Sequence, residues 1–169
     1  GALSADGTEG AIRRKMIEIG LVEAIVILPR NLFYSTDISV TLWILNANKK
    51  ARVINRNGEE IKYRDREKEF LFIDMRQMGE PLEKKYVQFS EADIRKVADT
   101  YHNWQREGHA DTYADVPEFC KSVTFAEIAD KDYSLVPSKY IEFVNRDETV
   151  DYDTRMKELQ SELSDILRK

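Results

Sequence analysis

The chain has 169 residues, of which 42% are hydrophobic and 10% aromatic, and it carries a formal net charge of -5. This length and composition are those of one folded domain, and they argue against a disordered or fibrous protein. The negative charge excludes a surface that neutralises nucleic acid over its whole area, so any such contact is expected to be local. The single cysteine, Cys120, cannot form an internal disulfide. Together with the short apolar runs, it indicates a cytoplasmic protein without a membrane span.

The first predicted element is a helix from residue 9 to about residue 19. Thr8 is a suitable cap for its start, and Gly20 is a suitable residue to end it. Helical periodicity predicts that its buried face carries Ile12, Met16 and Ile19.

Two strands are predicted next, over residues 22–28 and 38–45, because each is an almost continuous aliphatic run. Such runs are typical of strands that are covered on both faces. The short connection between them carries Phe33 and Tyr34, which we expect to be exposed above the sheet. A helix, strand, loop and strand in this order indicate the edge of an α/β fold.

A hairpin is expected over residues 52–64, because an Asn-Gly pair at its centre favours a tight turn between alternating strands. Residues 69–74 predict a further buried strand. A capping box opens a helix at Ser90 that ends near residue 108. The apolar stripe of this helix is predicted to be Ile94, Val97, Ala98, Tyr101 and Trp104.

The following region, up to residue 139, is expected to be mostly irregular, with a short helix near 125–129. A strand is expected over residues 140–144 and a linker after it. The last helix has apolar residues at spacings of four and three, which is typical of a seam that docks a partner: Tyr152, Met156, Leu159, Leu163 and Ile166. The alternative is that this helix packs on its own domain.

Several segments resemble one known family. Residues 1–49 contain, in order, a Gly-rich turn, an IRRK helix, the strand LVEAIVILP, the loop NLFYST and the strand ISVTLWILN. FLFIDMR, residues 89–104 and residues 117–140 continue the similarity over most of the chain. The chain resembles the C-terminal part of the modification (M) subunit of type I restriction-modification systems, which are adenine-N6 DNA methyltransferases.

The resemblance implies an α/β fold with part of a Rossmann-like methyltransferase sheet, whose last strands form an antiparallel pair. It implies that residues 1–50 are the edge of the catalytic domain, that 51–145 are an α+β extension, and that 146–169 are a linker and an end helix. The whole subunit would use S-adenosylmethionine. Its partners would be DNA, a specificity subunit, a restriction subunit and a second M subunit.

Two motifs of this enzyme class are absent from the sequence. Adenine methylation uses an Asn- or Asp-Pro-Pro-aromatic loop, and the chain has no Pro-Pro pair. The Gly-rich turn that binds the cofactor, with an acidic residue about 20 residues later, is also absent. We therefore expect a fragment that starts after the fifth strand and is inactive alone. The alternative is that residues from about 50 onward form a non-catalytic assembly module that docks the specificity subunit.

The resemblance aligns Phe33 with a loop aromatic that packs against a base rotated out of the duplex, and Tyr34 is next to it. An aromatic wall returns part of the stacking energy that an extruded base loses. The alternative is that Phe33 only plugs the top of the sheet. Asn31 and Thr36 are candidates for positioning the loop.

Arg13, Arg14 and Lys15 are candidate contacts to the DNA backbone, or else a solvated helix face. The turn before them, residues 7–10, is not a phosphate loop of the Walker type. The seam residues proposed to dock a partner are Met156, Leu159, Leu163 and Ile166.

No metal is expected, because the spacing of His102 and His109 matches no familiar zinc arrangement. Cys120 is expected to be a packed thiol, because no base is evident to activate it. The carboxylate-rich stretches 111–115 and 147–153 are expected to be solvated loops.

Overall fold

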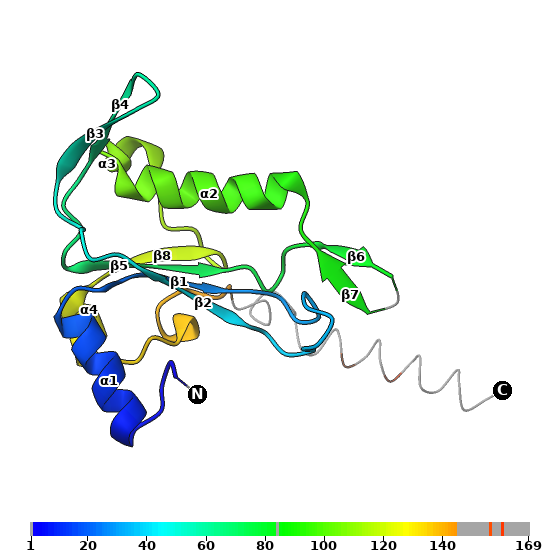
Figure 1. Cartoon of the computed structure of the whole chain (residues 1–169). Coiled ribbons are helices and arrows are strands. Elements are labelled where there is room, and N and C mark those ends of the chain that lie inside the picture. The colour runs from blue at the N-terminus through cyan, green and yellow to red at the C-terminus, as the bar shows by residue number, and fades with distance from the viewer. Residues whose placement is uncertain (1, 84, 145–155, 157–159, 161–169) are drawn as a thin grey trace.

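The computed structural model describes residues 2–83, 85–144, 156 and 160. A four-stranded mixed sheet lies at the centre of this part of the chain (Figure 1). Its strands are β1 (Val22–Ile27), β2 (Thr41–Leu45), β5 (Glu69–Asp74) and β8 (Cys120–Thr124).

Two hairpins and several helices complete the described chain. The hairpins are β3 (Arg52–Arg56) with β4 (Glu59–Tyr63), and β6 (Glu80–Leu82) with β7 (Tyr86–Gln88). The helical elements are α1 (Gly7–Glu18), α2 (Glu91–Gln105), α3 (His109–Thr112), α4 (Phe125–Asp130) and the 3-10 turn η1 (Pro137–Lys139).

The order of strands in the sheet is β2-β1-β5-β8. β1 is antiparallel to β2, which confirms the expected pair, and β1 is parallel to β5. β8 closes the other side as an antiparallel neighbour of β5. Because β1 and β5 are parallel, their carboxyl ends lie at the same edge of the sheet, on the right in Figure 1. In α/β sheets this edge is the usual place for ligands.

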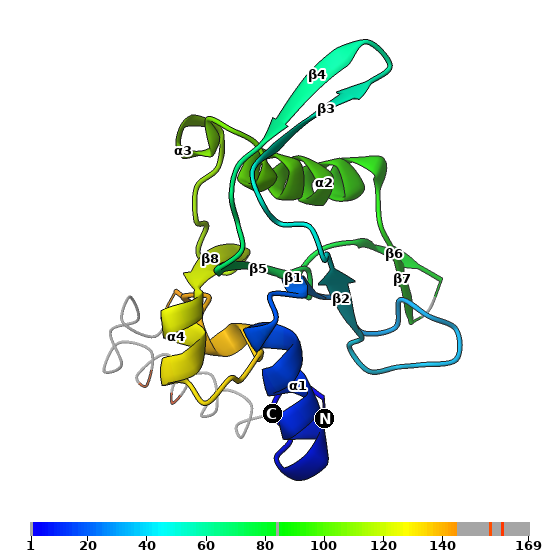
Figure 2. The ribbon, with the colours of Figure 1, turned by 60° about the vertical axis from the view of Figure 1, so that its left-hand side comes forward.

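Helices cover both faces of the sheet. α2 lies over one face, and α1, α4 and η1 lie under the other (Figures 1 and 2). The core under α2 includes Trp104, which is fully buried, with Val26 and Leu71 of the sheet. The opposite core includes Ile25 and Phe72. Burial on both faces explains why β1 and β5 read as continuous apolar runs.

The first helix differs from the prediction at its start and on part of its buried face. α1 begins at Gly7, with Asp6 rather than Thr8 at the cap position. Met16 packs against the core as expected, but Ile12 and Ile19 are 57% and 60% exposed. The buried residues of α1 are Arg13 and Ile17, so periodicity alone placed two of the three residues wrongly. The reason is that an arginine packs inward here.

Other predicted elements are confirmed: the β3–β4 hairpin, β5, the capped helix α2 and the short helix α4. Within α2, Ile94 is 56% exposed and does not belong to the packed stripe. β2 starts at Thr41 rather than at residue 38. The β6–β7 hairpin was not predicted from the sequence.

The region after α3 was predicted least well. β8 was missed, because the only apolar residues of CKSVT are Cys120 and Val123, which are three positions apart and give no strand periodicity. The strand expected over 140–144 is wrong: Pro137 opens a 3-10 turn, and the Tyr140 ring stacks on Phe72 with centroids 4.6 Å apart. Tyr140 and Ile141 fill the core without joining the sheet, whereas Phe143 and Val144 are exposed.

The division of the chain at residue 50 stays a prediction, although β1 and β5 from its two sides pair in one sheet. Of the seam residues, Met156 is described and is 39% exposed. Leu159, Leu163 and Ile166 lie outside the described residues. Among the described helices, none is both long enough and apolar enough to cross a bilayer.

Candidate functional site

The connection between β1 and β2 leaves the sheet at the carboxyl end of β1. Its base is closed by the Leu28 amide, which donates to the Val40 carbonyl at 2.8 Å. Asn31 then adopts a left-handed conformation with φ 59°, which asparagine tolerates better than most residues. A tight turn follows, in which the Thr36 amide donates to the Phe33 carbonyl at 3.2 Å. Asn31 and Thr36 thus shape the loop through their backbones.

Phe33 and Tyr34 sit on this turn and are 43% and 73% exposed. The neighbouring Leu32 packs against the core under α2 and anchors the loop there. The Tyr34 ring meets the Tyr86 ring of β7 edge-on, with centroids 4.6 Å apart. The two predicted site aromatics are therefore presented outward on a loop that is fixed at both of its sides.

A groove of about 520 Å³ opens between this loop and the β6–β7 hairpin. The Val87 amide donates to the Asn31 carbonyl at 3.1 Å and joins the two walls. The lining residues are Pro29, Arg30, Asn31, Ser39, Arg76, Gln77, Met78, Gly79, Pro81 and Val87. The groove lies at the edge where β1 and β5 end, and sequence reasoning did not predict it.

Arg76 enters this groove from the loop after β5. Its Nε and Nη2 atoms donate to the buried carboxylate of Asp74, the latter at 2.6 Å. These hydrogen bonds raise the pKa of the Arg76 guanidinium above its ordinary value. Because Asp74 is only 5% exposed, the carboxylate lies behind the guanidinium and fixes its direction.

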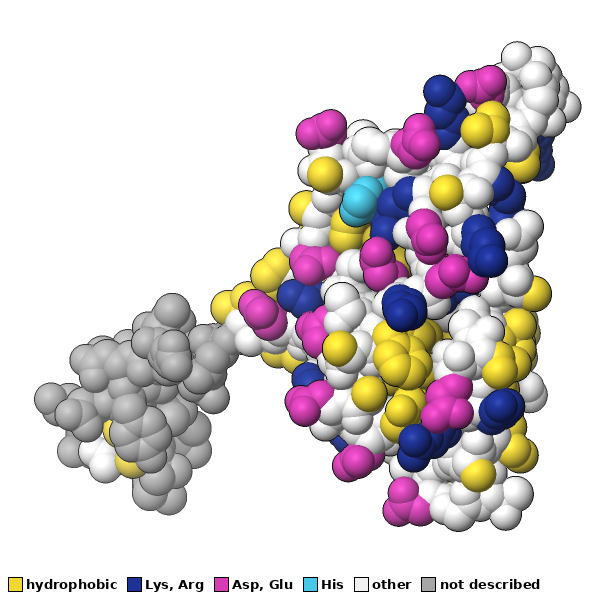
Figure 3. All heavy atoms as spheres, turned by 90° about the vertical axis from the view of Figure 1, so that its left-hand side faces the viewer, with side chains coloured by type: hydrophobic (Ala, Val, Ile, Leu, Met, Phe, Trp, Pro, Cys, Tyr) yellow, Lys and Arg dark blue, Asp and Glu magenta, His cyan; other side chains and the backbone are white. Residues whose placement is uncertain are grey.

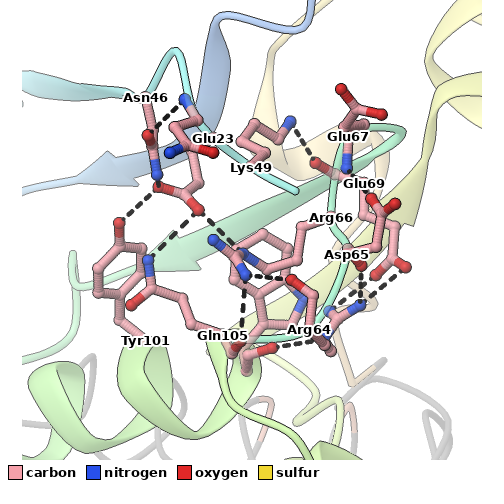
Figure 4. A network of polar contacts seen from close by, with 12 residues as sticks. Glu23, Asn46, Lys49, Arg64, Asp65, Arg66, Glu67, Glu69, Tyr101 and Gln105 are labelled. Atoms are coloured by element: carbon pink, nitrogen blue, oxygen red, sulfur yellow. Dashed lines mark hydrogen bonds and ion pairs between the residues drawn. The ribbon is translucent and has the colours of Figure 1, made fainter. Parts of the chain in front are cut away.

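A buried polar network lies on the α2 side of the sheet, at the start of β1 (Figure 4). Val22 pairs with Leu45 but Ala24 pairs with Ile44, so Glu23 is an extra residue in a β-bulge. Bulges re-aim side chains. The Glu23 side chain is fully buried among polar partners from the segment after β2, from α2 and from the loop before β5.

The Glu23 carboxylate accepts four hydrogen bonds. The donors are Asn46 and Tyr101, each at 2.8 Å, Arg66 at 3.0 Å and Gln105 at 3.3 Å. Although burial opposes the charge, these bonds hold the pKa of Glu23 below its ordinary value. The sequence signal for this network is an acidic residue inside an otherwise aliphatic strand.

Lys49 extends the network. Its ammonium donates to the carbonyls of Val22 and Glu69, both at 2.9 Å. The side chain is almost fully buried, and burial lowers the pKa of Lys49 to about 8. The network joins the start of β1, the segment after β2, α2 and the segment before β5, at the end of the sheet opposite the aromatic loop.

The three basic residues predicted to contact DNA from α1, Arg13, Arg14 and Lys15, lie in different environments. Arg13 is 5% exposed, and its guanidinium donates to the carbonyls of Tyr133, Ala2 and Ala5. It is therefore not accessible for a phosphate. Arg14 pairs with Glu18 at 2.8 Å on the surface, and Lys15 is exposed. On the face shown in Figure 3, basic and acidic side chains alternate without a continuous basic band.

The remaining titratable candidates lie apart from this edge. The Cys120 thiol is buried, which raises its pKa, and it contacts the Ala114 carbonyl. Asp115 is not simply solvated, because it accepts from Tyr113 and the Ser122 amide. Among the described residues, no three His, Cys, Asp or Glu side chains form a group that fits a metal ion. Residues 147–153 lie outside the described part.

Comparison with known proteins places the chain in a family. The N-6 DNA methylase family matches residues 1–149. The methylase subunit of the type I restriction enzyme HindI from Haemophilus influenzae is 37% identical over 98% of this chain, which covers 34% of that protein. The MjaVIII methylase subunit from Methanocaldococcus jannaschii is 33% identical over 100% of the chain, which covers 26% of it. The chain thus spans between about a quarter and a third of the length of these relatives.

The fold agrees with this relationship. The methyltransferase subunit of a type I restriction-modification system from Streptococcus thermophilus superposes with a TM-score of 0.64 at 24% identity, over 85% of this chain and 25% of that one. The expected relationship to type I modification subunits is confirmed. The chain belongs to the N-6 DNA methylase family.

Proposed function

We propose that the chain forms the edge of the catalytic domain in a type I modification subunit, which transfers a methyl group from S-adenosylmethionine to N6 of adenine in DNA. The observation that carries the proposal is the pair of exposed aromatics, Phe33 and Tyr34, at the carboxyl edge of β1 and β5. An extruded adenine needs an aromatic surface at this position, because it loses its stacking neighbours. The relatives, all named methylase subunits, support the assignment.

The sheet of this chain is proposed to be one part of a larger Rossmann-like sheet. Among the described strands, β2 has a neighbour on one side only, which is β1. Leu42 and Leu45 of β2 are 46% and 47% exposed. Beside them, Ile12, Met16 and Trp43 line a nearly apolar groove of about 260 Å³. An uncharged open strand next to an apolar groove suits a further strand and helix from the rest of the subunit.

The methyl donor and the Pro-Pro loop are proposed to belong to that remaining part. The sequence of this chain contains no Pro-Pro pair. Phe33 then acts on the base and not on the cofactor, and the chain by itself transfers no methyl group. A cheap test is the reading frame before this sequence, which should encode a Gly-rich cofactor turn and the Pro-Pro loop; an upstream stop codon would contradict the proposal.

The specificity subunit, the restriction subunit and a second M subunit are the proposed partners. The end helix with Met156 is the proposed docking element for the specificity subunit. In the alternative, the part of the chain after residue 50 only assembles the complex. The groove and the aromatic loop favour the catalytic-edge proposal, because an assembly module needs neither.

The decisive experiment uses the complete subunit with its specificity subunit, and compares Phe33→Ala, Tyr34→Ala and the control Ser35→Ala, which lies on the same turn. Stacking on an aromatic ring contributes about 1–3 kcal/mol per base, so Phe33→Ala should slow methyl transfer by roughly 5- to 150-fold. The affinity for S-adenosylmethionine should not change. Equal losses of rate and cofactor affinity would mean that the ring is structural.

A further inference from the structure

The groove between the β1–β2 loop and the β6–β7 hairpin has the chemistry of a nucleotide site. We propose that it holds one sugar-phosphate unit of the DNA strand next to the extruded base, with Arg30 and Arg76 on the phosphate. This inference rests on the proposed function and adds to it the residues that position the strand.

The groove differs from the rest of the protein in its local charge. The chain as a whole has a net charge of -5, yet the ten lining residues include two arginines and no Asp or Glu. Acidic side chains of this region, such as Glu80 of β6, are not among the lining residues. A concave site of one sign concentrates field and attracts the opposite charge. Arg76 is paired with the Asp74 carboxylate behind the groove, whereas no ion pair of the described residues involves Arg30, so Arg30 supplies the net positive charge that favours an anion here.

Both guanidinium groups have donors left for a ligand. The Arg76 guanidinium uses Nε and Nη2 on Asp74, which leaves Nη1 for a ligand. Arg30 is exposed, and among the described residues its one side-chain hydrogen bond is from Nε to the Asp37 carbonyl, at 3.1 Å. An arginine held by a carboxylate on one side is oriented in advance, so less freedom is lost when a phosphate binds on the other.

The groove lining also includes apolar and neutral polar groups. Pro29, Met78 and Val87 provide an apolar surface against which a deoxyribose ring can pack. Asn31 and Gln77 add neutral polar groups. The volume of about 520 Å³ lies within the range of about 300–1,000 Å³ that is typical of small-molecule sites. A bare phosphate would leave most of this space empty, whereas a nucleotide unit fills it.

The groove lies next to the aromatic loop. The Tyr34–Tyr86 ring contact and the bond from the Val87 amide to Asn31 make the loop and the hairpin one unit. Figure 2 shows the loop beside β6 and β7, as does Figure 1. A strand whose base leaves the duplex at Phe33 has its neighbouring sugar-phosphate at this groove.

The test uses the full chain and a fluorescein-labelled single-stranded oligonucleotide in fluorescence anisotropy, over salt from about 50 to about 200 mM. Arg30→Ala should weaken binding about tenfold, because it removes a charge-assisted hydrogen bond. It should also reduce the slope of log K against log salt by about 0.7, the value for one phosphate contact on a single strand. Arg76→Ala should act in the same way. Arg56→Ala, an exposed arginine at the end of β3, is the matched control and should change neither value.

Arg76→Ala leaves Asp74 without its partner, so the folding of this variant is checked by circular dichroism. If Arg76→Ala unfolds, Arg30→Ala, at an exposed position, still decides the test. Equal weakening by Arg30→Ala and Arg56→Ala, or no binding by the wild-type chain, would overturn the groove assignment. If dAMP displaces the oligonucleotide at equal concentration, the site is a mononucleotide pocket and the strand assignment is wrong. The groove test reads DNA binding and not methyl transfer, so its failure is distinct from failure of the Phe33→Ala test.

Discussion

Removal of the Glu23 charge is predicted to destabilise the protein strongly. Glu23→Gln keeps the shape of the side chain but leaves the Arg66 guanidinium, which is fully buried and 3.0 Å away, without its counter-charge. Breaking a buried ion pair on one side costs about 3–5 kcal/mol. For a chain of this size each kcal/mol corresponds to roughly 2–4 °C, so the melting temperature should fall by about 6 to 20 °C.

The double variant Glu23→Gln/Arg66→Met tests whether the cost comes from the unpaired charge. It should be no less stable than Glu23→Gln alone, because it removes the cation that the single variant leaves buried. The matched control is Glu67→Gln, which makes the same change at an exposed residue that lies 3.9 Å from Lys50. This control should cost less than about 1 kcal/mol.

The assay is urea unfolding, followed by tryptophan fluorescence and circular dichroism. Trp104 is fully buried, so its emission reports the loss of the core that holds the network. The folded-state pKa of Glu23 is depressed, so its stabilisation is present above the pKa of the unfolded carboxyl and is lost as pH falls below about 4.5. The variant and the wild type should therefore converge in acid. A cost below about 1 kcal/mol at neutral pH would refute the reasoning.

Three further outcomes are expected. Burial lowers the pKa of Lys49 to about 8. Between that pH and about 10.4 the unfolded state therefore binds more protons than the folded state, so the free energy of unfolding measured in urea should rise with pH. In Lys49→Met this contribution to the rise should be absent. Arg13→Met should lower that free energy by about 1–3 kcal/mol, because three carbonyls lose a donor, whereas an equal effect of Lys15→Met would contradict the internal role of Arg13. The double variant Leu159→Asp/Leu163→Asp should weaken pull-down of the specificity subunit without changing the circular dichroism spectrum, since each leucine buried in the interface contributes roughly 1.5–3 kcal/mol to binding. Unchanged pull-down would count against a docking seam.

The sequence was most informative where local pattern and burial agree. Residues 22–28 and 69–74 are buried on both faces, and their apolar runs predicted β1 and β5 well. The Asn-Gly turn and the Ser90 capping box act within a few residues, so their hairpin and helix were also predicted.

The missed features depend on partners that are far away in the chain. β8 is a strand because β5 pairs with it, and its own sequence does not show this. The inward packing of Arg13 depends on the carbonyl of Tyr133, 120 residues later. The groove likewise forms only when the β1–β2 loop meets the β6–β7 hairpin. The exposed aromatics were anticipated from the short loop itself, whereas Arg30 and Arg76 carried no local signal.

The unpaired side of β2 has a practical consequence for the isolated polypeptide. The strand TLWIL has no charge and no proline, so nothing in it discourages pairing with the same strand of a second molecule. In concentrated solution the purified protein should self-associate along this strand, and dilution should reverse it. Replacing the outward-facing Leu42 with lysine is the simplest way to obtain a monodisperse sample.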